Sequence, residues 1–417
     1  HRGSSHRGGE KRQTGYNQQR VMKKLTVIIV NFNVKFYVEQ CLVSLQKALE
    51  GIDSDIYIVD NHSRDDSVGY LRRRFRDVNI VVSNHNLGFA RANNVAIRQS
   101  ESDYVLLINP DTFVAENTIR EALAFMDSHA DAGGVGVMMH NPNGTVAMES
   151  RRGLPTPITS FYKMTGLCAR FPNSRTFAKY YMSYLSWDSP QQIDIISGAF
   201  CMLRRKAIDD VGILDEDFFM YGEDIDLSYR LLKGGWRNWY LPLHILHYKG
   251  ESTQKSSFHY IHVFYQAMLI FFRKHYGHFN IWLSLPIKTA IYFKAFLALI
   301  KTQVYNTRKS LGFNVRKRPY PTYCFVGAQR MLQQCRQITR AKGLTAVFHS
   351  YEEPIDIENW VDTSNGQPVY LVLDTTHFSF AEVIDIIKGI QNPNITLGTF
   401  NSKTKVLITP EEVLRQQ

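Results

Sequence analysis

The chain has 417 residues, of which 44% are hydrophobic and 12% aromatic, and it carries a net charge of +11. Because a single hydrophobic core rarely grows to this size, we expect two or three globular domains. The five cysteines are odd in number and form no CxxC pair, which excludes a disulfide framework and a cysteine zinc site and favours a reducing, cytoplasmic compartment.

Two segments, residues 1–21 and residues 252–351, differ in composition from the rest of the chain. Residues 1–21 are polar and lack the apolar run of a signal peptide, so we interpret them as a tag or a disordered tail before Met22. Residues 252–351 contain no Asp or Glu but fifteen of the 49 Lys and Arg residues. A surface for an anionic partner is therefore expected in that second segment.

Four short apolar runs rich in β-branched residues alternate with polar loops and helical patterns. The runs are residues 25–30, 56–59, 80–82 and 104–108. Such alternation is typical of an α/β domain in which helices flank a mostly parallel sheet. All four polar loops then fall at the carboxyl ends of the strands, where ligands bind in such sheets.

The polar loops carry residue types that suit a nucleoside diphosphate. Asp60 can accept hydrogen bonds from a base or a ribose, and Phe32 can support a ring. Gly88 permits close backbone approach beside Arg91, which can pair with phosphate. Ordinary turn chemistry is the alternative for each of them. Asp111, which follows the fourth run, could hold a divalent cation, with an Asx turn as the alternative.

A cluster of acids marks the start of a further amphipathic helix. Asp217, Glu223, Asp224 and Asp226 lie among aromatic residues, an apolar setting for four carboxylates. One interpretation is a general base at the mouth of a pocket. The other is a group of acids that caps the helix N-terminus.

These motifs, in this order, resemble those of the family 2 glycosyltransferases with the GT-A fold, particularly the rhamnosyltransferase-like branch. The resembling stretches are residues 27–33, 59–67, 86–94, 109–111 and 222–227. The resemblance extends over about residues 24–252. It implies that Asp60 contacts the nucleotide base, that Asp111 binds Mg²⁺ or Mn²⁺ with the donor diphosphate, and that Asp224 deprotonates the acceptor hydroxyl.

One position departs from the family pattern. Asn109 stands where the first acid of the metal-binding motif is usual, so Asp111 needs a second ligand. The resemblance and the affinity of imidazole for metals favour His247 over His244, whereas a histidine within the core is the alternative.

The remaining expected site residues follow from the same motifs. Glu223 is expected on the acceptor side, and residues 151–190 are interpreted as a variable acceptor-binding insertion. The full donor-binding set is Asn31, Phe32, Asp60, Asn86, Gly88, Arg91, Asn109 and Gly198.

The C-terminal third of the sequence changes character. We assign residues 22–255 to the glycosyltransferase domain and residues 256–305 to amphipathic helices. Lys288 and Lys294 would each cost about 2.5–3.5 kcal/mol at the centre of a bilayer, which argues against a spanning helix. The heptad spacing of Lys294, Lys301 and Arg308 predicts instead a helix lying on an anionic membrane surface, with packing on the protein's own core as the alternative.

A basic linker and a second α/β region complete the chain. Residues 306–321 form the linker, and residues 322–417 repeat the strand–helix pattern, which predicts a small Rossmann-like domain. Gly327 stands without a GxGxxG motif, so a structural or partner-binding role, including self-association, is favoured over nucleotide binding.

The sequence thus predicts a metal-dependent, inverting glycosyltransferase at the cytoplasmic face of the cell membrane. Its expected partners are a nucleotide-diphosphate sugar, with dTDP-rhamnose as one option, and a lipid-linked or polysaccharide acceptor of cell-surface glycan synthesis. No nucleic-acid partner is expected. A nucleotidylyltransferase is one alternative, although residues 31–33 offer no base for a triphosphate. A non-catalytic scaffold that binds nucleotide sugars is the other.

Overall fold

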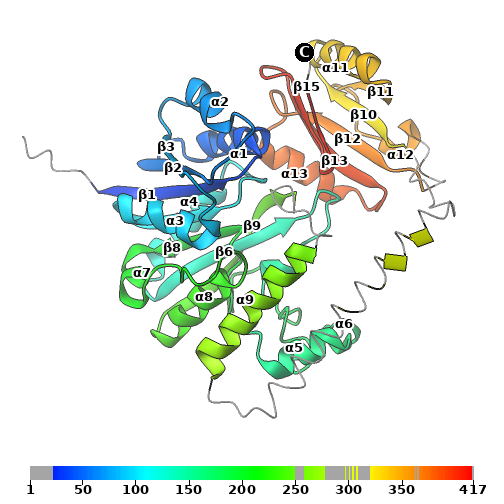
Figure 1. The fold of residues 1–417 in the computed structure, drawn as a ribbon. Helices are drawn as coiled ribbons and strands as arrows, with labels where there is room; N and C mark the ends of the chain where they lie inside the picture. The colour runs from blue at the N-terminus through cyan, green and yellow to red at the C-terminus, as the bar shows by residue number, and fades with distance from the viewer. Residues whose placement is uncertain are drawn as a thin grey trace, which may run out of the picture.

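The structure is a computed structural model with two β-sheets and their covering helices (Figure 1). It describes residues 22–248, 258–277, 296, 300, 303–304, 307–308, 320–361, 363 and 366–415. The expected α/β architecture, with a large and mostly parallel sheet flanked by helices and a second sheet in the C-terminal region, is confirmed.

The first half of the large sheet contains the four strands that the sequence predicts. They are β1 (Lys23–Asn31), β2 (Ser54–Asp60), β3 (Asn79–Val82) and β4 (Ser102–Ile108). All three pairings, β3 with β2, β2 with β1 and β1 with β4, are parallel. Their carboxyl ends therefore meet at one edge of the sheet.

Helices cover both faces of these strands because the strands are apolar on both sides. Val27 and Ile29 of β1 pack into one core cluster, and Ile28 packs into the cluster on the opposite face. The first cluster includes residues of α1 (Lys35–Ala48), α2 (Ser67–Arg74) and α4 (Thr118–Ser128). The second includes residues of α3 (Gly88–Gln99), α7 (Arg205–Val211) and α8 (Glu223–Lys233). All five cysteines are buried and unpaired.

The second half of the large sheet mixes strand directions. Its strands are β5 (Thr112–Val114), β6 (Ala132–His140), β7 (Gln191–Ile193), β8 (Phe200–Arg204) and β9 (Arg237–His247). The sheet order is β3-β2-β1-β4-β8-β6-β9-β5, with β7 also paired to β9. β8 lies antiparallel between β4 and β6, and β5 lies antiparallel to β9. The last pairing sets Thr112 opposite His247, which brings residues distant in sequence to one place.

Short helices and one long helix lie around this sheet. They are η1 (Met148–Ser150), α5 (Pro157–Met164), α6 (Leu167–Arg170) and α9 (Phe258–Tyr276). Helix α9 lies within residues 256–305, which the sequence predicts to form amphipathic helices. Most of the predicted second amphipathic helix, with Lys294 and Lys301, lies outside the described residues. Among the helices that the structure describes, none combines the length and apolarity needed to cross a bilayer.

The C-terminal region forms a six-stranded sheet in the order β11-β10-β12-β13-β14-β15. Its elements are β10 (Thr322–Gly327), α11 (Gln329–Lys342), β11 (Thr345–Ser350), α12 (Ile357–Trp360), β12 (Val369–Asp374), α13 (Phe380–Gly389), β13 (Ile395–Asn401), β14 (Val406–Ile408) and β15 (Val413–Arg415). The first four strands in this order pair in parallel, and β14 and β15 add an antiparallel edge.

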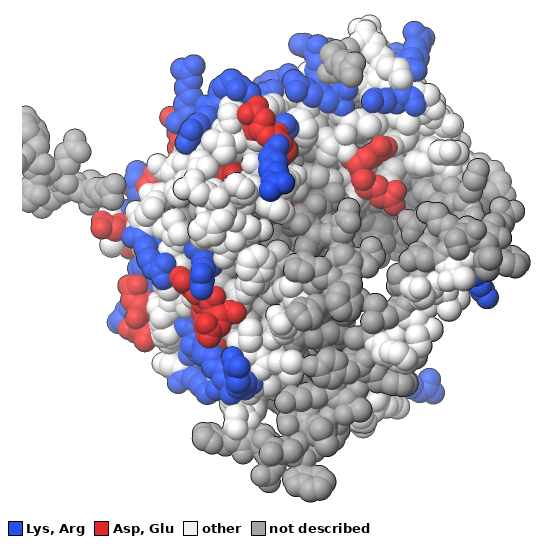
Figure 2. All heavy atoms as spheres, viewed as in Figure 1, with Lys and Arg blue, Asp and Glu red and all other residues white. Residues whose placement is uncertain are grey.

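Basic side chains are conspicuous on α11, which belongs to the segment without acids. The helix carries Arg330, Arg336, Arg340 and Lys342 and no acid. In Figure 2 the Lys and Arg side chains gather along the top of the molecule, over α11 and α2. Four of the fifteen bases of residues 252–351 therefore lie on a helix of the C-terminal region.

Candidate active site

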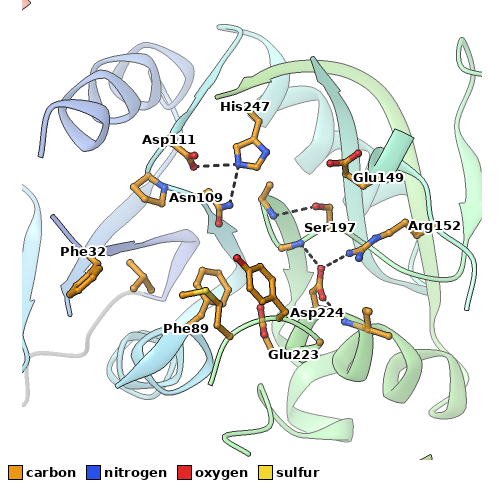
Figure 3. Close-up of a pocket in the computed structure, with 18 of the residues that line it drawn as sticks. Phe32, Phe89, Asn109, Asp111, Glu149, Arg152, Ser197, Glu223, Asp224 and His247 are labelled. Carbon is orange, nitrogen blue, oxygen red and sulfur yellow. Dashed lines mark hydrogen bonds and ion pairs between the residues drawn. The ribbon is translucent and has the colours of Figure 1, made fainter. Parts of the chain in front are cut away.

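A cavity of about 500 Å³ lies at the carboxyl ends of β1 and β4 and beside the start of α8. Figure 3 shows the side chains that converge on it. Its lining includes eight of the predicted site residues: Phe32, Asn86, Asn109, Asp111, Gly198, Glu223, Asp224 and His247.

Asn31 and Asp60 form a buried pair next to the cavity but do not line it. Their strands place them opposite each other, and the Asn31 side-chain amide donates a hydrogen bond of 2.7 Å to Asp60 Oδ1. The Ser63 backbone N–H donates to Asp60 Oδ2 over 3.0 Å. The Asp60 carboxylate is thus held in one orientation by two donors, and both residues are almost inaccessible to solvent.

The loop that precedes α3 closes another side of the site. Asn86 Oδ1 accepts a hydrogen bond of 2.8 Å from the Asn61 side chain, and both residues line the cavity. Gly88 has φ +78°, and an added Cβ would lie 2.4 Å from the Phe219 carbonyl oxygen, so this position requires glycine. Arg91 lies outside the lining and pairs with Glu216 at 3.6 Å.

Asp111 and His247 meet on one wall of the cavity. His247 Nε2 lies 3.3 Å from Asp111 Oδ1 and 3.3 Å from Asn109 Nδ2. The antiparallel pairing of β5 with β9 produces this contact, because it sets Thr112 beside His247. His244 points elsewhere and shares a 3.0 Å contact with His140.

This wall fits a divalent cation in part. Two ligand atoms that bind one octahedral cation at about 2.1 Å each are about 3 Å apart, which is close to the separation of Asp111 Oδ1 and His247 Nε2. His247 Nδ1 is buried without a hydrogen-bond partner, so the polar contacts of this ring are made by Nε2, which faces Asp111 and Asn109. Within the described residues, no group of three or more His, Cys, Asp and Glu side chains converges as metal ligands. Further ligands would have to come from substrate or water.

Asp224 lies on the opposite wall, in the first turn of α8. The chain enters this helix through Gly222, whose φ of +87° suits glycine. Asp224 Oδ2 accepts a hydrogen bond of 3.1 Å from the Gly198 backbone N–H and forms an ion pair with Arg152. Burial alone would lower the pKa of Arg152, but the Asp224 carboxylate raises it overall, so this arginine stays charged.

Glu223, the neighbour of Asp224, has a different environment. Its side chain is buried, and its Oε2 atom has no hydrogen-bond partner although the residue lines the cavity. Burial, and then the nearby Asp224 carboxylate, raise the pKa of Glu223 to about 8. Glu223 is therefore a largely neutral acid at pH 7, able to donate a hydrogen bond.

A third side of the cavity belongs to the aromatic-rich insertion. Arg152, Lys163, Tyr180 and Tyr181 of the insertion line it there, together with Glu149 of η1, just before the insertion. The sequence pattern marked the segment but none of these residues. A single arginine or tyrosine in a segment of weak periodicity carries no signal of its own, and the contact of Arg152 with Asp224 spans 72 residues.

The two walls differ in their chemistry. The wall of Asp111 and His247 offers an oxygen and a nitrogen ligand, and the wall of Asp224 offers a carboxylate fixed by an arginine and a backbone donor. Figure 3 shows the loop of Ser197 between them. Such a cavity could hold a metal-bound anion at one end and a hydroxyl group at the other.

Comparison with curated proteins finds similar sequences, of which three are described here. The N-acetylglucosaminyl-diphospho-decaprenol L-rhamnosyltransferase of Mycobacterium tuberculosis is 28% identical over 277 residues, which covers 63% of this chain and 88% of that protein. The low-salt glycan biosynthesis hexosyltransferase Agl10 of Haloferax volcanii is 26% identical and covers 51% and 63%. The rhamnosyltransferase WbbL of Escherichia coli is 27% identical and covers 39% and 61%.

Solved structures and a family model were also compared with the chain. The mannosyltransferase PcManGT of Pyrobaculum calidifontis, in complex with GDP-Man and Mn²⁺, gives a TM-score of 0.42 at 15% identity and covers 71% of this chain and 82% of that one. TarS 1–349 of S. aureus in complex with UDP gives a TM-score of 0.38 at 18% identity and covers 59% and 65%. The model of glycosyl transferase family 2 matches residues 26–212. This part of the chain, which contains Asp60, Asp111 and Arg152, is therefore a family 2 glycosyltransferase domain.

Proposed function

We propose that the protein is a metal-dependent, inverting glycosyltransferase that transfers a sugar from a nucleotide-diphosphate donor to a lipid-linked acceptor. The proposal rests on one observation. The Asp111–His247 pair and the Asp224 carboxylate line the same cavity, and Asp224 is held by partners of its own.

The proposal gives a role in donor binding to Asp60 and to the Asp111–His247 pair. Asp60, oriented by Asn31 and Ser63, would read the nucleotide base or ribose from beside the cavity. Asp111 and His247 would hold Mg²⁺ or Mn²⁺. When bound, the cation supplies positive charge to the departing diphosphate.

The acceptor side rests on proton transfer. Asp224 would take the proton from the acceptor hydroxyl as its oxygen attacks the anomeric carbon of the donor sugar. Inversion needs attack from the side opposite the leaving diphosphate, and the placement of Asp224 across the cavity from Asp111 supports such an attack. Arg152 and the Gly198 N–H would hold the carboxylate in a fixed direction throughout.

The relatives support the finer choice of substrates. Two of them are named as rhamnosyltransferases, which favours rhamnose as the transferred sugar and dTDP-rhamnose as the donor. The name of the mycobacterial protein includes a diphospho-decaprenol acceptor, which favours a lipid-linked acceptor here. We accordingly place the enzyme in cell-surface glycan synthesis, as a peripheral protein at the inner face of the membrane.

A turnover screen tests the proposal. The full chain is incubated with nucleotide sugars and a lipid-linked acceptor, with Mn²⁺ and after exhaustive chelation. We expect transfer only with the metal, and we expect Asp224→Asn to keep donor binding while losing about 10²–10⁴-fold in transfer rate.

The control is Asp210→Asn, which makes the same chemical change at an exposed position of α7. It should transfer sugar at the wild-type rate. Normal transfer by Asp224→Asn would contradict the catalytic assignment, and activity that survives chelation would contradict the metal assignment.

A further inference from the structure

The insertion that lines the acceptor side of the cavity is basic throughout. Residues 151–187 contain six Lys and Arg residues and no Asp or Glu. Arg151 is buried and Arg152 pairs with Asp224, whereas the other four side chains are exposed. They are Lys163, Arg170, Arg175 and Lys179. None of these four forms an ion pair with an acid in the part of the chain that the structure describes. Lys163 lies against tyrosine rings at the cavity, whereas the charges of Arg170, Arg175 and Lys179 face solvent.

Apolar side chains are exposed on the same segment. Ile158 and Phe161 of α5 are 59% and 56% exposed, and Phe171, just after α6, is 45% exposed. Ile158 and Phe161 lie three residues apart and so share one face of the helix. Phe161 and Phe171 are linked through the rings of Tyr162 and Phe177, at centroid distances of 6.1, 5.0 and 5.4 Å. The exposed side chains therefore form a patch rather than isolated residues.

This patch is continuous with the active-site cavity. Lys163 follows Phe161 by two residues, and its Nζ atom lies 3.9 Å from the centroid of the Tyr180 ring and 5.1 Å from that of Tyr181. All three of Lys163, Tyr180 and Tyr181 line the cavity. Helix α5 thus has one side at the cavity and another in solvent. Figure 1 places α5 and α6 at the periphery of the molecule, away from the C-terminal sheet.

We propose that residues 157–179, here named the α5–α6 surface, dock on an anionic lipid membrane and hold the mouth of the cavity at the level of the lipid headgroups. Exposed aromatic and aliphatic side chains flanked by uncompensated bases are the composition of a segment that lies in a membrane interface. The bases match the negative headgroups, and the apolar side chains enter the acyl boundary. The acceptor side of the cavity would then open where a lipid-linked diphosphate resides, a consequence that rests on the proposed function.

The test is co-sedimentation of the full chain with vesicles of phosphatidylcholine, alone or mixed with phosphatidylglycerol. One variant is Arg170→Gln with Arg175→Gln, and the other is Ile158→Ser with Phe161→Ser. Each base near an anionic surface contributes about a fivefold change in partitioning, so the first variant should bind the mixed vesicles about 25-fold more weakly. The second should also bind more weakly, and salt should weaken wild-type binding through screening.

Matched controls separate this surface from the general effects of charge and of exposed apolar side chains. Arg72→Gln with Arg76→Gln removes the same charge from exposed positions elsewhere, and Val82→Ser removes an exposed apolar side chain. Both should bind like the wild type. Unchanged binding by the two α5–α6 variants, equal binding to neutral vesicles, or an equal loss in the controls would each overturn the proposal. Unaltered thermal melting of the variants excludes misfolding as the cause.

The result of the vesicle experiment does not depend on whether the protein transfers sugar. Asp224→Asn should sediment with mixed vesicles like the wild type, whether or not the chain transfers sugar. A turnover screen without transfer would therefore contradict the proposed function but not the proposed membrane docking. Conversely, the protein could transfer sugar to a water-soluble acceptor while the two α5–α6 variants bind vesicles like the wild type. That result would contradict the docking proposal and support the proposed enzymatic function.

Discussion

Glu223 and Asp224 are neighbours in the first turn of α8, yet their surroundings differ. Asp224 accepts hydrogen bonds from Arg152 and from the Gly198 N–H. Glu223 is buried without a donor to its Oε2 atom, and burial raises its pKa to about 8. Two carboxyl groups whose environments differ in this way are a common arrangement for separate roles as base and as hydrogen-bond donor.

We expect Glu223→Gln to stabilise the protein increasingly as the pH rises from 5 to 8. The folded state binds the Glu223 proton more tightly than the unfolded state does, so the wild type loses stability as the pH climbs from the ordinary glutamate range toward the raised pKa. Glutamine keeps the neutral shape and does not titrate. Urea unfolding at several pH values should show a gain on the order of 1 kcal/mol per pH unit.

The control is Glu50→Gln, an exposed glutamate that undergoes the same change. Its difference from the wild type should not vary with pH. A pH-independent difference for Glu223→Gln would show that this carboxyl titrates normally.

Sequence reasoning located the acids and the histidine of the site but not the partners that orient them. Asp111 follows an apolar strand and Asp224 opens an amphipathic helix, and both patterns are local. Arg152 reaches Asp224 because the chain around it bridges to Ile195, a long-range contact with no local pattern. Arg91 shows the reverse case, since its motif suggested a phosphate but its side chain pairs with Glu216.

At the scale of elements, helix α9 is bound to α8 through one buried carboxylate. Asp226 is fully buried and accepts hydrogen bonds from Arg230 of α8 and His275 of α9, both at 2.7 Å. Lys274 of α9 adds an ion pair at 2.9 Å. Because Asp224 is two residues from this junction, α9 supports the helix turn that presents the proposed base.

We expect Asp226→Asn to loosen α9 at neutral pH. Burial alone would raise the pKa of Asp226, but the hydrogen bond from Lys274 and the charge of Arg230 lower it overall. A carboxylate with a lowered pKa stabilises the fold above its ordinary pKa, and this contribution disappears as the pH falls through the folded value. The variant should lose about 3–5 kcal/mol at pH 7, the usual cost of breaking a buried ion pair, and the difference should shrink below about pH 4.

Amide hydrogen exchange measures this effect where it occurs. Residues 258–276 should exchange faster in Asp226→Asn than in the wild type, whereas Asp210→Asn on the solvent side of α7 should leave them unchanged. Equal protection of α9 in all three proteins would mean that the ion pair is not what fixes the helix.

Elements with a strong local pattern were predicted well, and those defined by long-range pairing were not. The four apolar runs that predict strands lie within β1 to β4, because each is a short β-branched run with a polar loop at its end. The antiparallel strands β5, β8 and β9 were not resolved as strands of one sheet. β5 has three residues, and β9 contains Pro242 and pairs with three different neighbours, so neither shows the alternation of an isolated strand.

At the scale of the whole molecule, the C-terminal sheet packs directly behind the wall that carries Asp111 and His247. Tyr248, which follows His247, contacts Thr399 of β13 at 3.3 Å between hydroxyl oxygens. Phe113 of β5 packs on Phe380 of α13 with ring centroids 5.0 Å apart. The sequence indicated a second α/β unit but no contact surface for it, because the residues that meet are ordinary core residues of their own strands and helices.

This packing is anchored by Glu116, which caps a helix of the other sheet. Its carboxylate accepts hydrogen bonds from the backbone N–H groups of Phe380 and Ala381, at 2.8 and 3.0 Å, in the first turn of α13. Those groups have no partner within the helix, and a carboxylate also suits the positive end of the helix dipole. The Leu397 N–H donates to the Pro142 carbonyl and closes the other side of the interface.

We therefore expect Glu116→Ala to weaken the attachment of the C-terminal sheet and, through it, the proposed cation site. Loss of a capping side chain costs about 1–2 kcal/mol. Hydrogen exchange in residues 380–389 should accelerate, and Mn²⁺ should bind more weakly, because the strands that position Asp111 and His247 lose their backing. Glu358→Ala, which removes an exposed first-turn acid from α12, should change neither measurement. Wild-type exchange in α13 would show that the apolar contacts alone hold the sheets together. Faster exchange with unchanged Mn²⁺ binding would show that the C-terminal sheet is attached to the cation wall but does not support it.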